Sequence, residues 1–349
     1  MRVLIVRLSS LGDVIHATPV AAALRRRFPD ATIDWVVDEV NAQVLTLVPV
    51  IDRRIVLQTR SRSTISAWMA VRRDLRERRY DIALDVQGLC KSALMARLSG
   101  AKKVIGFDRP FLRESWAKWF YDAVVDVGEP VHVVERNLGI LKAVSVAVDE
   151  WEFPFKLDES EIGDKLSTRL NNSLEQFVLL NPNTAWENKC WPPDRFGAVA
   201  AHIRSVHGLS SLVVWGPGDE ERADAVVAAS SGAATRAPES SLVELAAMLS
   251  GGMLLVSGDT GVLHLAAALG TPVVGVYGPS DPARNGPWSP EDEVVSVSDD
   301  CYCLRRCGSL GAVGMVRRCR HATWCLDQIS VPDVCAAVDR RLRVISERA

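Results

Sequence analysis

The sequence predicts an α/β protein built from two halves with a cleft between them, each half a parallel sheet covered by helices. Short apolar segments rich in β-branched residues alternate with amphipathic helical segments along most of the chain, a pattern typical of parallel sheets covered on both faces. The length of 349 residues is enough for two hydrophobic cores. The alternation breaks once, at residues 150–158, where an aromatic and acidic stretch indicates a linker.

The first half is predicted to hold five strands, and apolar β-branched runs place them at residues 2–6, 33–37, 54–57, 82–86 and 104–107. Helical spacing predicts the helices between and after them, at residues 14–28, 39–47, 65–79, 88–99, 111–123 and 132–148. Pro19 falls inside the first of these helices, so we expect a kink or a short first segment there.

The second half repeats the alternation. Strands are expected at residues 177–180, 211–215, 253–256 and 273–277. Helices are expected at residues 194–206, 220–230 and 241–249, just after Asp259, and at residues 331–348.

The composition bears on the class of function. The net charge of −2 gives no whole-molecule field that would favour nucleic acid. The N-terminal residues lack the long apolar core of a signal peptide, and no apolar run approaches the ~18 residues of a membrane-spanning helix. We therefore expect a cytoplasmic protein, with a peripheral membrane contact left open.

Arginine is concentrated in one part of the chain. Residues 53–79 contain nine arginines and only two acidic residues, Asp74 and Glu77. Such a stretch is either a solvated helix face or a platform for an anionic partner.

The strongest local signal is the stretch from Gly258 to His264, where an apolar strand runs through Gly-Asp-Thr-Gly into a short helix. Asp259 or Thr260 is placed to cap that helix, and the glycines allow close approach of a ligand. The free N–H groups and the positive end of the helix dipole suit a phosphate group. The alternative is an ordinary capped strand–helix junction with a surface histidine.

Two other strand ends carry polar residues of the same kind. Thr184 and Lys189 follow the strand at 177–180, and a hydroxyl with a cation suits a diphosphate. Asp13 begins a helix after the first strand, where the dipole holds a carboxylate ionised and ready to accept a proton. Neither half has a Gly-x-Gly-x-x-Gly or a P-loop, which weakens dinucleotide oxidoreductase and P-loop interpretations.

Several segments together resemble glycosyltransferase family 9. In the first half they are residues 1–16, 34–39 and 85–92, and in the second half residues 189–192, 215–216, 258–264 and 277–282. The order is kept over nearly the whole chain, and the first-half segments are most similar to the heptosyltransferase I branch of that family. The resemblance implies a GT-B fold of two Rossmann-like domains facing across a cleft, a glycosyltransferase that needs no cofactor, and an inverting reaction.

The resemblance also implies substrates and residue roles. The donor would be ADP-L-glycero-D-manno-heptose, and the acceptor a Kdo sugar on lipid A, an anionic glycolipid at the inner membrane surface. Residues 1–158 would bind the acceptor and residues 159–349 the nucleotide sugar, an arrangement that allows the final helix to pack back on the first domain. Asp13 would be the general base. The donor would be held by Thr184, Lys189, Asp259, Thr260, Gly261 and His264, and the acceptor by Arg60, Arg62, Gln87 and Lys91.

Two features depart from the family pattern. In related enzymes a glutamate directly follows a Ser-Leu pair near the adenosine, whereas here Val243 follows it and Glu244 comes one place later. The tail holds six of the eight cysteines. Their spacing is compatible with a structural zinc or iron, with thiols and with disulfides. Related enzymes that glycosylate autotransporter proteins have a cysteine-held iron in this region. The candidate metal ligands are Cys301, Cys303, Cys307, Cys319 and Cys325.

Two alternatives to heptose transfer onto lipid A stay open at this stage. One is a family 9 enzyme with another donor sugar or a protein acceptor. The other is a non-catalytic binding protein on the same scaffold, in which replacing Asp13 would leave function intact.

Overall fold

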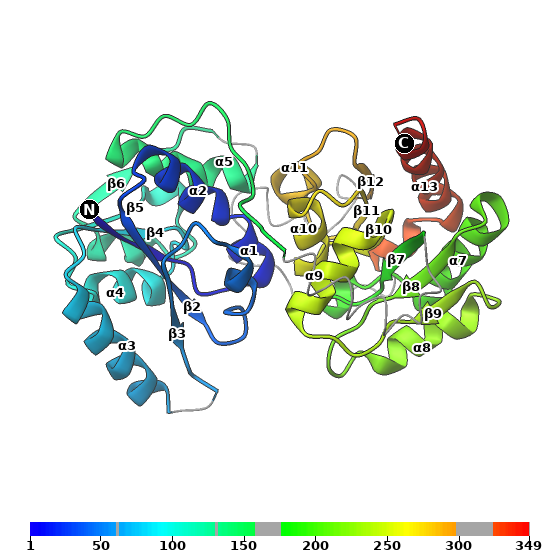
Figure 1. The fold of residues 1–349 in the computed structure, drawn as a ribbon, viewed down its shortest axis with the longest axis horizontal. Helices are drawn as coiled ribbons and strands as arrows, with labels where there is room; N and C mark the ends of the chain where they lie inside the picture. Colours follow the sequence, from blue (N-terminus) through cyan, green and yellow to red (C-terminus); the bar gives the residue numbers. More distant parts are fainter. Residues whose placement is uncertain (61–62, 130–131, 158–175, 298–323, 349) are drawn as a thin grey trace. The chain divides into compact units, whose positions relative to one another are not determined.

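The chain forms two compact α/β units, one from Met1 to Lys156 and the other beginning at Leu157 (Figure 1). The structure is a computed structural model that describes residues 1–60, 63–129, 132–157, 176–297 and 324–348. The boundary predicted after residue 158 falls outside the described residues.

The first unit is built on a six-stranded parallel sheet in the order β3-β2-β1-β4-β5-β6. Its strands are β1 (Arg2–Val6), β2 (Thr32–Asp38), β3 (Arg53–Leu57), β4 (Ile82–Asp85), β5 (Lys103–Phe107) and β6 (Ala123–Val125). Five of them lie where the apolar runs predicted strands. The central strands are buried along nearly their whole length, as expected of a sheet covered on both faces.

The second unit repeats this architecture, with the order β12-β11-β10-β7-β8-β9 and every pairing parallel. Its strands are β7 (Phe177–Asn181), β8 (Ser210–Val213), β9 (Ala234–Arg236), β10 (Leu254–Gly258), β11 (Val273–Tyr277) and β12 (Glu293–Ser296). Counted from its own first strand, the second sheet has the same order as the first. Each sheet reverses its winding direction once, at a switch point. This point lies between β1 and β4 in the first sheet and between β7 and β10 in the second. In doubly wound sheets, ligands bind at the carboxyl ends of the strands at this reversal.

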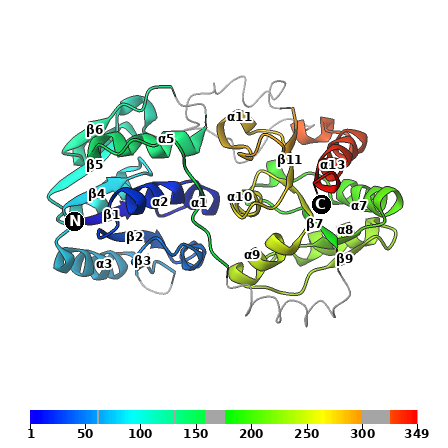
Figure 2. The same cartoon turned by 45° about the horizontal axis from the view of Figure 1, so that its top comes forward.

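Helices and 3₁₀ turns connect the strands (Figure 2). In the first unit these are α1 (Leu11–Ile15), α2 (Thr18–Arg27), η1 (Val44–Leu47), α3 (Thr64–Arg78), α4 (Cys90–Leu98), η2 (Arg109–Phe111), η3 (Ser115–Phe120), α5 (Val133–Gly139) and η4 (Ile140–Val144). In the second they are η5 (Glu187–Lys189), α7 (Pro193–His207), α8 (Glu220–Ala229), α9 (Leu242–Gly251), α10 (Gly261–Ala268), α11 (Pro282–Asn285), η7 (Cys325–Gln328) and α13 (Val331–Ser346).

Three connections of the first unit lie on one face of its sheet. The chain steps from β3 to β4, from β4 to β5 and from β5 to β6 in one direction, and such crossovers are right-handed. The crossing segments α3, α4 and η3 therefore cover the same face. Packing agrees, because α4 contacts both α3 and η3, and α3 and α4 run side by side in Figure 1.

Several predicted helices are shorter or of another type. The first breaks before Pro19, as expected, into α1 and α2. The helix predicted at 39–47 is wrong except for the 3₁₀ turn η1, because the Asp38 carboxylate accepts from the Asn41 backbone at 3.0 Å and fixes a turn there. The one predicted at 132–148 ends as α5 at Gly139 and continues as the 3₁₀ turn η4.

The helix predicted at 111–123 is also wrong. The chain forms the 3₁₀ segments η2 and η3 and then the edge strand β6. Between the two segments the N–H groups of Arg113 and Glu114 both donate to the Gly88 carbonyl, at 3.1 and 3.3 Å. These bonds compete with the helical pattern. The short edge strands β9 and β12 were not expected, because three or four residues give little periodicity to detect.

The last helix, α13, packs within the second unit against α7, β11 and β12. Arg340 and Arg341 pair with Glu293 and Asp292 at 2.7 and 3.2 Å. The expectation that this helix packs back on the first domain stays a prediction.

The contact between α7 and α8 depends on Gly197. A Cβ atom there would lie 2.5 Å from the Ala229 Cβ and 2.7 Å from the Ala229 carbonyl carbon. We expect Gly197→Ala to lower the free energy of unfolding by roughly 1–3 kcal/mol, because backbone must move to admit the methyl group. Gly251→Ala is the control, since its Cβ would meet only the Phe177 ring at 4.0 Å. Urea denaturation measures both variants, and equal stability of the two would contradict this assignment.

Candidate functional site

Asp259 and Thr260, the two polar residues of the turn after β10, have different roles. Thr260 is the N-cap of α10, and its Oγ1 accepts from the Val262 N–H at 2.9 Å and the Leu263 N–H at 3.5 Å. Asp259 is left free of capping. At helical spacing Val262, Leu265, Ala266 and Leu269 share one face of α10. Leu265 and Ala266 are buried, while Val262 and Leu269 are partly buried.

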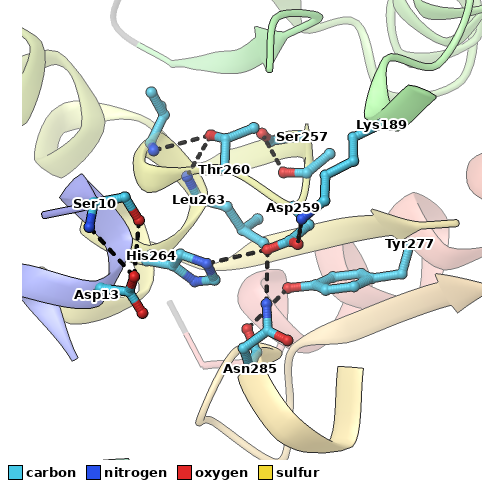
Figure 3. A network of polar contacts seen from close by, with 12 residues as sticks. Ser10, Asp13, Lys189, Ser257, Asp259, Thr260, Leu263, His264, Tyr277 and Asn285 are labelled. Carbon is cyan, nitrogen blue, oxygen red and sulfur yellow. Dashed lines mark hydrogen bonds and ion pairs between the residues drawn. The ribbon is translucent and has the colours of Figure 1, made fainter. Parts of the chain in front are cut away.

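The Asp259 carboxylate is the centre of a buried polar cluster (Figure 3). Lys189 forms an ion pair with it, and their side chains are 13% and 5% exposed. His264 Nε2 lies 3.2 Å from Asp259 Oδ1, and Asn285 Nδ2 donates to the same oxygen at 2.9 Å. Burial alone would raise the pKa of Asp259, but the Lys189 ammonium and His264 hold that pKa well below its ordinary value. The cluster is therefore an ionised carboxylate holding a lysine, an imidazole and an amide.

The ends of β7 and β10 are tied together next to this cluster. Asn181 Nδ2 donates to Ser257 Oγ at 2.9 Å and to Thr260 Oγ1 at 3.2 Å. A Cβ atom at Gly258 would lie 3.1 Å from the Lys189 carbonyl oxygen and 3.3 Å from the Thr184 methyl group. The glycine thus lets the loop after β7 approach the end of β10, which brings Thr184 and Lys189 to Asp259 and Thr260.

Two other residues of the second unit take part in local turns. Thr184 Oγ1 donates to the Trp186 carbonyl at 2.6 Å, and the Lys189 ammonium lies 5.3 Å from the centre of the Trp186 ring. Glu244 completes a capping box on α9, where its carboxylate accepts from the Ser241 N–H at 2.8 Å and Ser241 Oγ accepts from the Glu244 N–H at 3.3 Å. Glu244, which lies one place later than the glutamate of the family pattern, is therefore the N3 residue of α9 and caps that helix.

In the first unit, Asp13 lies at the start of α1, just beyond β1. Its carboxylate pairs with Arg7, which is fully buried, at 2.6 Å and with Arg113 at 3.4 Å. Ser10 Oγ donates to it at 3.0 Å (Figure 3). Burial alone would raise the pKa of Asp13, but Arg7 and Arg113 outweigh it and hold that pKa well below its ordinary value. Asp13 is therefore a carboxylate that stays ionised.

The neighbouring strand end, after β4, supports the Asp13 turn. Gln87 is 2% exposed, and its Oε1 accepts from the Leu8 N–H at 2.9 Å. Arg7 donates to the Val86 carbonyl. The buried Asp85 accepts from Tyr121 OH at 2.6 Å and Ser92 Oγ at 2.9 Å, and burial raises its pKa. Gln87, expected to bind the acceptor, thus holds β1 and β4 in register through its carbonyl oxygen.

The remaining predicted residues are spread more widely. Arg60 follows β3 with an exposed side chain, and its N–H donates to Glu39. Lys91 is exposed on α4, close enough to Asp38 to act on its charge. Arg62 and the tail residues Cys301, Cys303, Cys307 and Cys319 lie outside the described residues. Cys325 is buried beside Gly278, where an added Cβ would lie 3.2 Å from its sulfur.

Sequence reasoning missed Arg7, Arg113 and Asn285 as members of these clusters. Arg7 carried a detectable signal, because a charged residue that ends an apolar strand needs a buried partner. Arg113 is separated from Asp13 by 100 positions, and Asn285 lies on the four-residue helix α11. No local pattern marks either of them.

Together the two switch points offer complementary chemistry. The second unit presents a lysine, a histidine and a helix N-terminus, groups that can bind and neutralise a diphosphate. The first presents an ionised carboxylate, which can accept a proton. Within the described residues, each cluster lies at the carboxyl ends of the strands where its sheet reverses.

Comparison with known proteins gives one consistent answer. The model of the family described as glycosyltransferase family 9 (heptosyltransferase) matches residues 68–310. Lipopolysaccharide heptosyltransferase 1 of Pseudomonas aeruginosa is 34% identical over 316 residues, which are 88% of this chain and 87% of that protein.

Solved structures agree with the sequence relatives. The E. coli heptosyltransferase WaaC with ADP matches at a TM-score of 0.77 and 27% identity, covering 98% of this chain and 100% of its own. The same enzyme with ADP-2-deoxy-2-fluoro heptose matches at 0.73 and 27%, covering 100% of both chains. The similarity confirms the predicted fold of two Rossmann-like domains.

Proposed function

The chain belongs to glycosyltransferase family 9, and from this premise we propose that it transfers heptose from ADP-L-glycero-D-manno-heptose to a Kdo sugar of lipid A. Its two Rossmann-like domains form the GT-B fold, and it is a glycosyltransferase. The observation that carries the proposal is the Asp259 cluster at the switch point of the second sheet. Its cation and helix N-terminus suit the diphosphate of a nucleotide sugar.

The donor side follows from the charges of that cluster. The diphosphate gains negative charge as the bond from the anomeric carbon to its oxygen breaks. Lys189 would neutralise this charge, with Thr184, Thr260, Gly261 and His264 completing the site. A bound diphosphate competes with Asp259 for the ammonium, so Asp259 holds Lys189 in place until the donor arrives. No metal ion or cofactor is required in this mechanism.

The acceptor side needs a base and recognition of anions. In an inverting transfer the acceptor oxygen attacks the anomeric carbon from the face opposite the leaving ADP. Asp13 would take the proton of the acceptor hydroxyl as the new bond forms. Arg60, Arg62 and Lys91 would then bind the carboxylate of Kdo or the phosphates of lipid A.

Donor screening tests the proposal directly. The purified chain, incubated with Kdo-lipid A and a panel of ADP- and UDP-sugars, should form a heptosylated product only with ADP-heptose, detected by mass spectrometry. Turnover of a UDP-sugar but not of ADP-heptose would overturn the donor assignment. Transfer to a protein but not to Kdo-lipid A would overturn the acceptor assignment, and no turnover at all would favour a binding protein.

The lowered pKa of Asp13 predicts the acid side of the activity profile. A carboxyl whose pKa is lowered on folding adds stability above its unfolded value of about 3.9, and this is lost as pH falls through the folded value. Asp13 therefore stays ionised between pH 5 and 8, roughly the usual working range. Arg113→Gln removes one cation, so its acid-side loss of activity should begin at higher pH than in the wild type. An acid-side loss of kcat/KM that begins at lower pH in the variant than in the wild type would contradict this assignment.

A further inference from the structure

The outer surface of the layer formed by α3, α4 and η3 exposes large apolar side chains. Ile65 and Met69 on α3 are 79% and 54% exposed, and Trp116 and Trp119 on η3 are 72% and 69% exposed. Both elements contact or flank α4 on the same face of the first sheet. Single exposed apolar residues are ordinary, but here two pairs of them flank α4, one pair on each of the elements that contact it.

Helix α3 is apolar on two opposite faces. Its inner face packs on the sheet through Ala67, Val71 and Leu75, which are buried. On the outer face, Ile65 and Met69 are one turn apart and lead to a basic stripe at Arg73 and Arg76. A surface helix normally presents polar residues there, so Ile65 and Met69 have no role in the core of this unit.

Segment η3 holds its tryptophans side by side. Side chains at i and i+3 of a 3₁₀ helix lie above one another, so Trp116 and Trp119 project in one direction while Ala117 is buried. The Lys118 ammonium lies 5.5 Å from the centre of the Trp119 ring. Tryptophan beside a cation is typical of the boundary between water and lipid, because the ring has an apolar body and a polar N–H.

The net charge of this region is positive. Residues 63–120 contain 12 lysines and arginines and six aspartates and glutamates, within a chain whose net charge is −2. Arg73, Arg76, Arg79, Lys91 and Arg97 are all exposed there. Each basic side chain near an anionic lipid surface contributes about 1 kcal/mol of attraction.

We propose that the outer face of α3, α4 and η3 docks on the surface of an anionic lipid bilayer. Trp116, Trp119, Ile65 and Met69 enter the interfacial layer, and the arginines contact lipid phosphates. The described part of the chain contains no helix with the length and apolar character of a membrane span. This inference rests on the proposed function, in which the acceptor is a lipid. It adds which face of the first unit contacts the bilayer.

Vesicle flotation tests the surface without any catalysis. The full chain should float with vesicles of phosphatidylethanolamine and phosphatidylglycerol, less with phosphatidylcholine alone, and less at high salt. W116S/W119S should bind more than about tenfold more weakly. Arg73→Gln with Arg76→Gln should weaken binding by about fivefold for each arginine. Because I65S/M69S changes a different element, its weaker binding would show that the face, and not one loop, is responsible.

The control is Val206→Ser on α7, which replaces a side chain that is 58% exposed in the second unit. It should bind vesicles as the wild type does. Failure of the wild type to float, or unchanged binding of both apolar double variants, would overturn the proposal. All variants are compared at equal thermal stability, which exposed positions should keep.

Kinetics separate this surface from the proposed function. W116S/W119S should lose turnover on acceptor embedded in vesicles and keep the wild-type kcat/KM on an acyl-free Kdo acceptor. An equal loss on both acceptors would place the tryptophans in the reaction itself and overturn a membrane role. If ADP-heptose is not the donor, the activity assays fail while the flotation result still stands.

Discussion

Asp13→Asn should strongly reduce turnover while leaving ADP binding unchanged. The amide has almost the shape of the carboxylate but cannot accept the proton of the acceptor hydroxyl, so kcat should fall by about 10²–10⁴-fold. The residues proposed to hold the donor all belong to the second unit, whereas Asp13 belongs to the first. Calorimetric titration with ADP and a transfer assay measure the two quantities on one preparation.

The substitution Asp13→Asn also affects Arg7, the buried ion-pair partner of Asp13. Arg7 is fully buried and pairs with Asp13 at 2.6 Å, so the variant also removes a charge that the guanidinium needs. Ser10→Ala is the matched control, because it removes the 3.0 Å hydrogen bond to the same carboxylate and keeps the base. It should retain most activity. Turnover of Asp13→Asn within about tenfold of the wild type would exclude a general base at this position.

Lys189→Met should both destabilise the second unit and weaken the binding of ADP. Removing one partner of a buried ion pair costs about 3–5 kcal/mol, because it leaves an uncompensated charge, here the Asp259 carboxylate. Loss of a charge-assisted contact with the diphosphate should raise the Kd for ADP by roughly 10- to 100-fold. Urea denaturation and calorimetric titration measure the two effects.

A second substitution separates stability from binding. In the double variant Lys189→Met with Asp259→Asn the stranded charge is gone, so stability should recover in part. Affinity for ADP should not recover, because no cation has been returned. Lys91→Met serves as the control for loss of a lysine, since Lys91 is exposed and lies in the first unit. A stable Lys189→Met variant with normal ADP affinity would contradict the assigned role.

Much of the fold was predictable because each strand of a doubly wound sheet is an apolar run with clear boundaries. The failures have local physical causes. Residues 39–43 have a helical pattern, but the Asp38 side chain offers the backbone an alternative hydrogen bond. Residues 111–123 have aromatic spacing typical of a helix, but the Gly88 carbonyl holds two of their N–H groups.

The sequence predicted which positions of the chain belong to the candidate site better than it predicted which side chains contact one another there. Strand ends with Asp, Thr and Lys can be recognised in a sequence, and Asp13, Lys189 and Asp259 all lie at switch points. The sequence could not decide whether Asp259 or Thr260 caps α10, because both side chains accept from N–H groups. The choice depends on Lys189, which reaches Asp259 across 70 positions of sequence.

The position of α13 affects how such chains can be recombined. This helix follows the second sheet in sequence and packs on it, through α7, β11 and β12. Everything after Leu157 that the structure describes therefore belongs to one unit. A chimera that joins the first unit of one relative to the second unit of another needs a single junction, near residue 157. Under the proposed function, such a chimera should take its acceptor preference from the first unit and its donor preference from the second.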